Sequence, residues 1–524
     1  MSGSGIFVTI VIIGLLVALV KERLRPGLIL LTGAIIFLVT GIISPKEVLE
    51  GFSNKGMITV AFLFLISEGV RRSGLLETLL NRWLPQEKAP IYKVQWRMMS
   101  VVAFISAFLN NTPVVVIFAP LLKRWAGRMN FPATKLLIPL SYATILGGMC
   151  TLIGTSTNLV VHGMALQQAA LHPESGVRGL GLFELGQVGI VIALVGIIYI
   201  LLASKFLLPK HRVSVTDDKT DHLHPLHSRV EVVLGARFPA IGRSVRNFDF
   251  KMKYGAEIYE IRRHGKTLLL HDMRKVKFKE GDTLVLRADE TFIKNWGDSS
   301  FFLMVSGQHL LVSEMGKCKR WFTVLLLLMM ILGATVGELP VMAGLIPGVK
   351  LDMFFFAAIT VVLMAWCNMF PARKYTKFIS WDILVTIAMA FAISKAMQNS
   401  GMADTIGTWA VEMSQGKNPY FLLALVYIIC SLFTEIMTNN AAAALMFPIA
   451  VSVAQHLGVS PMPFIVIICI AASASFCTPI GYQTNLIVQG VGGYKFSDFF
   501  RMGLPLNILV ASLSIGLVPL FWPF

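Results

Sequence analysis

Apolar residues recur along most of this 524-residue chain in runs long enough to cross a lipid bilayer. A helix needs about 20 such residues to span the hydrocarbon core. Continuous runs predict ten crossing helices, at residues 5–20, 27–44, 56–70, 136–152 continuing to 170, 183–208, 321–337, 351–370, 380–396, 463–490 and 503–521. The pattern therefore predicts an α-helical polytopic membrane protein.

Two further apolar stretches are interrupted at their centres by polar residues. Residues 97–126 contain Asn110-Asn111-Thr112-Pro113, and residues 418–456 contain Thr438-Asn439-Asn440. Paired amides facing lipid would leave polar groups without partners in mid-bilayer. We therefore expect each stretch to form a re-entrant hairpin that enters and leaves by the same face.

The distribution of basic residues predicts the orientation. Lys and Arg gather in segments 21–26, 71–97, 123–135, 372–378 and 495–501, and the opposite loops 171–182, 398–418 and 457–462 contain almost none. Because cytoplasmic loops carry the excess of Lys and Arg, the basic segments are assigned to the cytoplasm. Ten crossings and two hairpins then leave both termini outside, in what we expect to be the cell (inner) membrane.

A polar segment separates two membrane halves, residues 1–208 and 321–524. Residues 210–320 hold 21 of the 46 Lys and Arg residues. Short strand patterns at 229–234, 256–270 (with a turn near His264-Gly265) and 283–288 predict a small α/β domain in a cytoplasmic insert at 209–320. The net charge of +17 is accounted for by basic membrane edges and this insert, so we expect no nucleic-acid partner.

The two membrane halves contain an internal repeat. Residues 150–163 read CTLIGTSTNLVVHG and residues 477–490 read CTPIGYQTNLIVQG, an offset of 327. Residues 67–80 match 394–407 at the same offset. The Asn hairpins correspond when Asn110-Asn111 is aligned with Asn439-Asn440. Five crossings and one hairpin per half require the second half to be inverted, an arrangement typical of secondary transporters.

The interrupted helices suggest a binding chemistry. Exposed carbonyls at a helix end attract cations, and exposed amides attract anions. Asn side chains and loop carbonyls form a neutral oxygen cage that suits Na⁺, so two breaks predict two sodium sites. Hydroxyls of Thr112, Thr155 and Tyr482 would face a shared cavity suited to a compact anion. We expect Asn440 to cap the helix that follows it. The membrane halves contain no nucleophile–base pair, phosphate loop or zinc motif, so an enzyme is not expected.

Glu435 lies just before the second Asn tip. A carboxylate inside a membrane is a candidate functional group, and Glu435 is therefore a possible coupling residue, either as a cation ligand or as a proton carrier. The alternative is that it lies at the outer mouth or pairs with Lys395.

These tips and breaks together resemble the divalent anion:sodium symporter (DASS) family of sulfate and di- and tricarboxylate carriers, over roughly 5–208 and 321–524. The resemblance implies two inverted repeats in a homodimer of scaffold and transport domains that works by an elevator motion. By position it implies a first sodium site at Asn110, Asn111, Gly154 and Asn158, and a second at Asn439, Asn440, Gly481 and Asn485. It implies anion contacts at Asn111, Thr112, Thr155, Asn440, Ala441 and Tyr482.

The chain departs from the pattern typical of carboxylate carriers. The second tip lacks a hydroxyl at Ala441, and the usual paired prolines are replaced by Ser156-Thr157 and Gln483-Thr484. These departures favour a smaller tetrahedral oxyanion, sulfate, imported with sodium. A sodium-coupled dicarboxylate carrier for a solute such as succinate, a proton-coupled oxyanion exporter and a ligand-gated ion channel are the alternatives.

The insert resembles the C-terminal domain of regulators of K⁺ conductance (RCK-C, or TrkA-C) at about 229–296. The likeness is carried by Ile241-Gly242, Tyr254-Gly255, Ile261-Arg262-Arg263 and Gly281-Asp282. It implies dimerisation and a possible small regulatory ligand. Arg262, Arg263 and Lys266 could hold an anionic ligand, and an ordinary solvated strand edge is the alternative.

Overall fold

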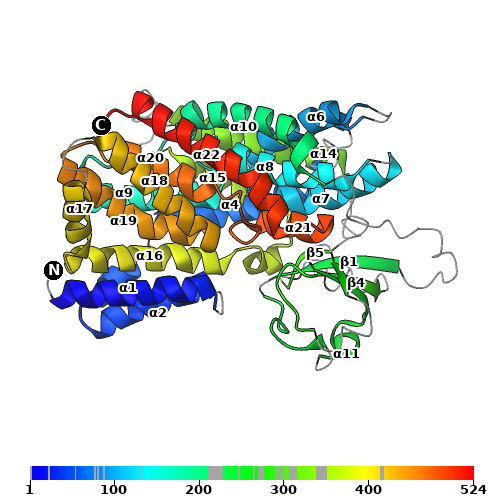
Figure 1. The fold of residues 1–524 in the computed structure, drawn as a ribbon, viewed down its shortest axis with the longest axis horizontal. Helices are drawn as coiled ribbons and strands as arrows, with labels where there is room; N and C mark the ends of the chain where they lie inside the picture. The colour runs from blue at the N-terminus through cyan, green and yellow to red at the C-terminus, as the bar shows by residue number, and fades with distance from the viewer. Residues whose placement is uncertain are drawn as a thin grey trace.

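The structure is a computed structural model. It describes residues 3–524 apart from 22–23, 54, 76–77, 79–81, 86–88, 130, 210–227, 236, 246–247, 264–265, 269–275, 289–291, 293–295, 297–298, 300, 306–315, 338–350 and 414–417. Helices fill both predicted membrane halves, and a β-sheet lies between them in sequence and to one side of them in space (Figure 1).

The first half is helical throughout its described residues apart from short connections. Its helices are α1 (Gly3–Lys21), α2 (Pro26–Val39), α3 (Pro45–Glu50), α4 (Lys55–Arg72), α6 (Ile91–Ser106), α7 (Asn111–Arg128), α8 (Leu137–Gly148), α9 (Ser156–Leu171) and α10 (Gly186–Leu207). Local chemistry sets several of the starts. Pro26 stands at the beginning of α2, where a missing N–H costs nothing. Ser44 and Glu47 form a reciprocal capping box at the start of α3.

The second half repeats this helical character. Its helices are α14 (Lys317–Gly337), α15 (Met353–Trp366), α16 (Trp381–Asn399), α17 (Met402–Met413), α18 (Pro419–Ile436), α19 (Asn439–Leu457), α20 (Met462–Ser473), α21 (Gln483–Gly492) and α22 (Phe496–Phe521). The side chains of Asp352 and Asn418 accept from backbone N–H groups at the starts of α15 and α18.

The lengths and compositions of the helices fit a membrane protein. Within the described ranges, seven helical stretches are long and apolar enough to cross a bilayer, and four shorter apolar helices accompany them. Apolar side chains also cover much of the outer surface, as on Phe104, Phe206 and Trp366, which are 70%, 79% and 85% exposed. Such a surface is stable in lipid, not in water.

The helix breaks occur where the sequence predicts them. Helix α6 ends at Ser106 and α7 begins at Asn111, and α18 ends at Ile436 and α19 begins at Asn439. The two repeated motifs also interrupt helices, between α8 and α9 and between α20 and α21. All four predicted interruptions are therefore confirmed. One local expectation is wrong, because Asn440 lies inside the first turn of α19 and does not cap it; Thr438 is the residue before the helix.

The described residues of the insert form a five-stranded sheet in the order β3-β2-β4-β1-β5. The strands are β1 (Ser228–Leu234), β2 (Glu257–Arg263), β3 (Lys266–Leu268), β4 (Thr283–Ala288) and β5 (Phe302–Val305), with α11 (Phe250–Tyr254) packed alongside. Named strands pair antiparallel. The predicted strands are confirmed, whereas the turn at His264-Gly265 lies outside the described residues. Strand β5 pairs with β1, so the sheet extends beyond residue 296.

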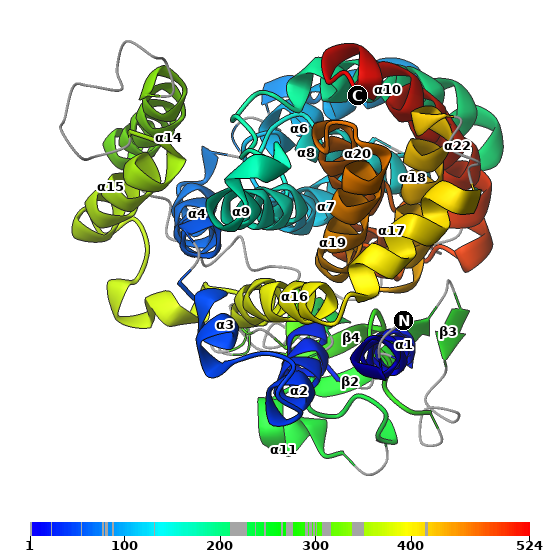
Figure 2. The same cartoon turned by 90° about the vertical axis from the view of Figure 1, so that its left-hand side faces the viewer.

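Seen at right angles to the first view, α14 and α15 stand apart on one side of the membrane helices, and α1–α3 lie below α16 (Figure 2). We call α6–α10 with α18–α22 the hairpin bundle, and α1–α4 with α14–α17 the flanking helices. Within the bundle α6 packs on α8, α18 on α20 and α10 on α22, whereas α16 packs on α2 and α4 on α15 in the flanking group. The groups meet where α4 contacts α9 and where α16 and α17 contact α19.

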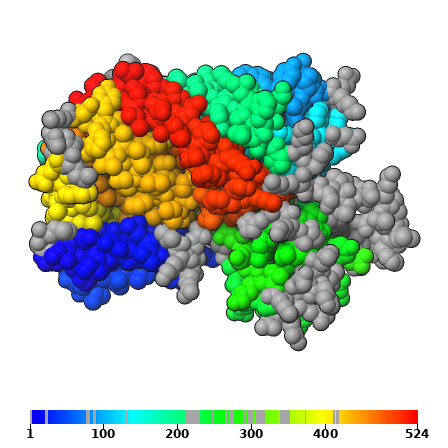
Figure 3. Space-filling view, viewed as in Figure 1, coloured from blue at the N-terminus to red at the C-terminus, as the bar shows by residue number. Residues whose placement is uncertain are grey.

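The insert adjoins the C-terminal part of the bundle, as the contact between green and orange-red atoms in Figure 3 shows. Its Glu231 accepts from Lys123 Nζ of α7 at 2.7 Å. The tight turn at Gly281, with φ +78°, lies against Leu486 of α21, and a Cβ there would be 2.7 Å from Leu486 Cδ1. Only glycine suits both the positive φ and this close approach.

Candidate functional site

The break between α8 and α9 is held by a single asparagine. Asn158 Nδ2 donates to the carbonyl of Thr151 at 2.9 Å and to that of Gly148 at 3.4 Å. The Thr151 hydroxyl in turn accepts from the backbone N–H of Gly154 at 3.2 Å. A Cβ on Gly154 would lie 2.6 Å from the Gly148 oxygen, so the turn requires glycine.

The break between α20 and α21 is held by the same bonds in the second half. Asn485 Nδ2 donates to the carbonyls of Ser475 at 2.9 Å and Thr478 at 3.1 Å. The backbone N–H of Gly481 donates to the Thr478 hydroxyl at 3.2 Å. Each residue stands 327 positions after its counterpart, so the sequence repeat is also a repeat of hydrogen bonds.

Within each hairpin, a hydroxyl near the end of the first helix binds the asparagine that begins the second helix. The hydroxyl of Ser106 donates to Asn111 Oδ1, and that of Thr434 donates to Asn439 Oδ1 at 2.8 Å. Because the two bonds are equivalent, Asn111 of the first half corresponds to Asn439 of the second half.

The hydroxyl bonds between the breaks and the tips give the same register. Thr151 donates to the carbonyl of Ala107, and Thr478 donates to that of Glu435. The offset at the tips is thus 328, so the alignment of Asn110 with Asn439 is wrong by one residue. The structural counterparts are Asn110 and Thr438, and Thr112 and Asn440.

The two halves meet at Tyr482, the residue equivalent to Thr155. Its hydroxyl lies 3.1 Å from Thr155 Oγ1 and accepts from Asn111 Nδ2. Tyr482 is only 8% exposed and also contacts Asn439. One phenol therefore joins both hairpin tips and both breaks at the centre of the bundle.

A second pair of contacts crosses between the halves. Thr112 Oγ1 donates to Gln483 Oε1 at 3.3 Å, and Ser156 Oγ donates to Asn440 Oδ1 at 3.3 Å. Thr157 Oγ1 also donates to Asn440 Oδ1, at 3.2 Å. The structure thus brings together five of the six predicted anion contacts. The sixth, Ala441, is fully buried in an apolar cluster of the flanking helices and α19.

The oxygen atoms at the breaks fit a sodium ion. Asn158 Oδ1 is buried and has no hydrogen-bond partner within the described part of the chain. A buried amide oxygen without a partner is unfavourable unless another ligand occupies it, and hard cations prefer such neutral oxygens. In the second half Asn485 Oδ1 accepts from Ser141 Oγ at 2.7 Å, so the two sites differ.

Glu435 occupies the backbone turn at the second break. Its carboxylate accepts from the N–H groups of Phe476, Cys477 and Thr478 at 2.8–2.9 Å. Lys395 lies instead near Glu47, on α3. The alternative of a Glu435–Lys395 pair is therefore wrong, because the backbone amides satisfy this carboxylate.

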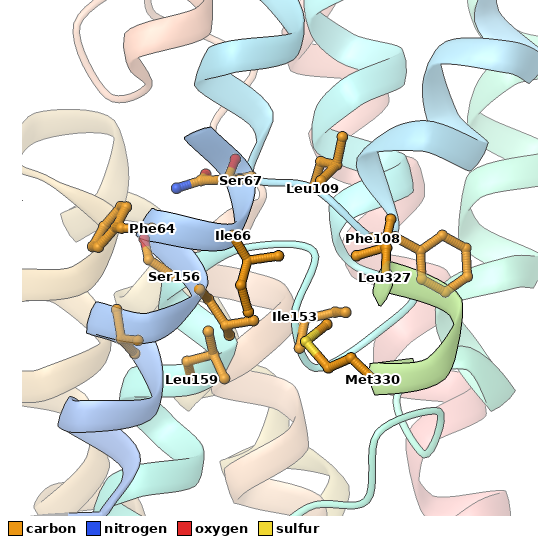
Figure 4. Close-up of a pocket in the computed structure, with 13 residues that line it drawn as sticks. Phe64, Ile66, Ser67, Phe108, Leu109, Ile153, Ser156, Leu159, Leu327 and Met330 are labelled. Atoms are coloured by element: carbon orange, nitrogen blue, oxygen red, sulfur yellow. The ribbon is translucent and has the colours of Figure 1, made fainter. Parts of the chain in front are cut away.

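A small hollow, with a volume of about 30 Å³, adjoins the first tip (Figure 4). Ser67 of α4, Asn110 and Ser156 supply its polar side chains, and apolar residues such as Phe64, Ile153 and Leu327 supply most of the rest. The hollow lies between the flanking helices and the hairpin bundle. Asn110, whose side chain has no hydrogen bond within the described residues, and Ser156 of α9 both line it.

Sequence reasoning missed several participants. Ser141, Gln483 and Asn507 all contribute hydrogen bonds at the breaks. Gln483 follows Tyr482 directly, and its place in the repeated motif could have marked it as a site residue. Ser141 and Asn507 lie in other helices without any motif, so only the folded structure reveals them.

Comparison with known proteins decides the class of this molecule. A profile of the citrate transporter family, CitMHS, matches residues 16–465 and 345–524. The chain belongs to the citrate transporter family. It is an integral membrane protein of a transporter family, as the sequence predicts, and this class agrees with the expectation that it is not an enzyme.

Individual relatives extend the comparison. The chain is 30% identical to an uncharacterised transporter of Synechocystis sp., over 98% of this chain and 96% of the relative. It is 23% identical to sodium/sulfate cotransporter 1 of Chlamydomonas reinhardtii, over 89% and 84%. The crystal structure of the YdaH transporter of Alcanivorax borkumensis, described as having an unusual topology, superposes with a TM-score of 0.55 and 12% identity, covering 95% of this chain and 99% of that one. This last likeness shows that our citrate transporter family member and the YdaH transporter share a fold.

Proposed function

We propose that this chain is a secondary transporter that imports a divalent oxyanion, sulfate in the first place, together with sodium. The observation that carries the proposal is the duplicated cage at the two breaks, where Asn158 and Asn485 hold equivalent carbonyls. A relative that is named as a sodium/sulfate cotransporter supports the same solutes.

Within this proposal sodium binds at the two cages and the anion binds between them. The first cage would use Asn110, Asn111, Gly154 and Asn158, and the second Asn439, Asn440, Gly481 and Asn485. The anion would replace the contacts that now join Thr112 to Gln483 and Ser156 to Asn440. A hydrogen-bonded oxyanion is favoured there because hydroxyl and amide donors become available once these contacts separate.

Tyr482 supports a small solute. Its ring stands where the first half has the much smaller Thr155, and its hydroxyl already binds Asn111 of the first tip and Thr155 of the first break. A tetrahedral oxyanion fits such a reduced space better than a longer dicarboxylate or a tricarboxylate. The rival solute class is a carboxylate such as succinate or citrate, which the description of the family favours.

We also propose the remaining features of the sequence analysis. The matched hydrogen bonds support two inverted repeats, each with five crossings and a re-entrant hairpin, and membership of the DASS group. The division into a hairpin bundle and flanking helices supports an elevator motion of the bundle in a homodimer. We assign the insert to the cytoplasmic side of the cell membrane and keep its RCK-C resemblance and regulatory ligand as proposals. Among the residues named for that ligand, the side chain of Lys266 lies outside the described part.

Uptake into proteoliposomes tests the function. We expect labelled sulfate to accumulate under an inward sodium gradient and not when choline replaces sodium. Unlabelled sulfate, succinate and citrate are then compared as competitors at one fixed gradient. Sulfate uptake that is unchanged in choline would contradict sodium coupling, and stronger competition by succinate or citrate would assign the site to carboxylates. A pH-driven flux that is independent of sodium would support the proton-coupled exporter instead.

A further inference from the structure

Glu435 is the carboxylate at the second break, and its oxygen atoms are fully engaged by donors. Three consecutive backbone N–H groups, one hydroxyl and one side-chain amide point at it. The donors are Phe476 N at 2.9 Å, Cys477 N at 2.8 Å, Thr478 N at 2.9 Å, Ser475 Oγ at 3.3 Å and Asn507 Nδ2 at 2.9 Å. Five donors match an ionised carboxylate, which only accepts hydrogen bonds. The structure therefore fixes a negative charge at this break.

This charge acts on one of the carbonyls in the second cage. The N–H of Phe476, which binds Glu435 Oε1, belongs to the same peptide unit as the carbonyl of Ser475. That carbonyl accepts from Asn485 Nδ2 at 2.9 Å. Hydrogen bonds in a chain polarise one another, so a carboxylate on the N–H side makes the oxygen on the other side more negative. A more negative carbonyl is a stronger ligand for Na⁺.

The first half has the same peptide without the charge. Ala107 stands where the second half has Glu435, because the carbonyls of both residues accept a threonine hydroxyl. The peptide between Gly148 and Met149 is the counterpart, and its N–H makes an ordinary helical bond to Ile145 at 3.3 Å. The Gly148 carbonyl is held more weakly by Asn158, at 3.4 Å. The two cages therefore share their shape and differ in charge.

We propose that the Glu435 carboxylate is a positioning residue that makes the second sodium site the tighter of the two. This inference rests on the proposed sodium-coupled function. Sodium would bind the second site without the solute, since Glu435 balances its charge. Among the described residues no carboxylate is hydrogen-bonded to the first break. The first site would therefore fill together with the anion, whose charge supplies the balance. Glu435 thereby sets the order in which the ions bind.

Sodium binding to the purified full-length protein tests the inference without transport. The midpoint of thermal unfolding is measured against Na⁺ concentration in detergent, without any anion substrate and with choline keeping the ionic strength constant. For Glu435→Gln we expect the Na⁺ concentration at half-maximal stabilisation to rise roughly tenfold or more, because a neighbouring opposite charge typically changes such an equilibrium by about one to three powers of ten. Glu412→Gln, which removes an exposed carboxylate at the end of α17, is the matched control and should leave it unchanged.

A second pair of variants covers the case in which Glu435→Gln does not fold. Asn507→Lys keeps the carboxylate and places a positive charge beside it, whereas Asn507→Met has similar length and no charge. We expect the lysine variant to weaken Na⁺ binding several-fold relative to the methionine variant, in line with the attraction between opposite charges that are close together. Equal Na⁺ binding by the two Asn507 variants, or by Glu435→Gln and the wild type, would overturn the inference.

A double-mutant cycle locates the effect. Glu435→Gln should be non-additive with Asn485→Ala, which removes the second cage, and additive with Asn158→Ala, which removes the first. The opposite pattern would refute an action on the second site. Failure of the proposed function gives a different result. If the wild type shows neither sodium-dependent uptake nor sodium-dependent stabilisation, sodium coupling itself is wrong. If the wild type depends on sodium and Glu435→Gln binds Na⁺ as the wild type does, only this inference is rejected.

Discussion

Asn158 and Asn485 are equivalent residues with different surroundings. Both donate to two carbonyls of their own break. The amide oxygen of Asn485 accepts from Ser141, whereas that of Asn158 is buried with no partner in the described structure. Leaving a buried acceptor without a partner costs about 1–3 kcal/mol. The oxygen of Asn158 is therefore the group with most to gain from a bound cation.

Replacing Asn158 by leucine keeps the approximate volume and removes this oxygen. The first site is expected to fill together with the anion, so the Na⁺ titration of thermal unfolding is made here with sulfate present. We expect the Na⁺ concentration for half-maximal stabilisation to rise roughly tenfold, because a hydrogen-bond-strength contact with a charged group is worth about 1.5–3 kcal/mol. Asn399→Leu, at an exposed helix end, is the control and should bind Na⁺ like the wild type. An unchanged Na⁺ titration for Asn158→Leu would show that this oxygen is not a sodium ligand.

Tyr482 allows a test of solute size. Tyr482→Thr gives the second half the residue of the first, and it removes both the ring and the bond to Asn111. We expect uptake of citrate or succinate relative to sulfate to rise at least about fivefold, since the loss of one hydrogen bond and the added space act in the same direction. Tyr482→Phe removes only the hydroxyl and should lower sulfate uptake without admitting the larger anions. A ratio that stays constant in Tyr482→Thr would exclude a role in size selection.

The sequence predicts which residues form the breaks but not how they pair. Asn-Asn dipeptides and the Gly-x-x-Thr-Asn motif stop a helix for local reasons, and such signals are readable without a structure. The register between the tips is not readable, because the sequence match is best when Asn110-Asn111 is aligned with Asn439-Asn440, whereas the hydrogen bonds of the folded structure make Asn111 the counterpart of Asn439. The partners of Glu435 are also hidden, since Asn507 lies 72 positions further along the chain. Contacts between distant helices depend on packing and leave no local pattern.

Helix α21 connects the centre of the bundle with the insert. It begins at Gln483 beside Tyr482 and ends at Gly492, a length of roughly 15 Å. Near its end Gly490 lies against the insert, where a Cβ would be 2.8 Å from Thr283 Oγ1. One short helix therefore contacts both the candidate site and the sheet. A displacement of α21 at the candidate site would also move its contact with the insert.

A larger side chain at position 490 should separate the insert from α21. In Gly490→Val we expect faster cleavage within the insert by limited trypsin digestion, because the crowded contact with Thr283 favours the undocked arrangement. Gly516→Val is the matched control, since a Cβ at Gly516 meets nothing within 4 Å. Equal cleavage rates for Gly490→Val and the control would show that this contact does not hold the insert.

At the scale of the whole molecule, the insert is bound to the hairpin bundle and lies close to the flanking helices. Glu231 pairs with Lys123 of the hairpin bundle at 2.7 Å, with both side chains about one-fifth exposed. Arg237 lies close enough to Asp382, at the start of α16 in the flanking group, for the opposite charges to attract each other, without an ion pair between these two described residues. If the insert stays close to the flanking helices while the bundle moves, as in the proposed elevator, the Lys123–Glu231 pair must stretch or break. The insert is placed to restrain that motion.

Removing the Lys123–Glu231 pair tests this restraint. We expect Lys123→Met and Glu231→Gln each to raise the initial rate of sulfate uptake at saturating sodium about two- to fivefold, the effect of a pair worth roughly 0.5–1 kcal/mol in the docked state. The double variant should be no faster than the faster single variant, because both substitutions remove the same interaction. Glu231 also binds Arg262 at 3.0 Å, so the Lys123 variant is the cleaner of the two. Rates that fall, or that multiply in the double variant, would mean that the contact supports transport or acts through something other than this pair.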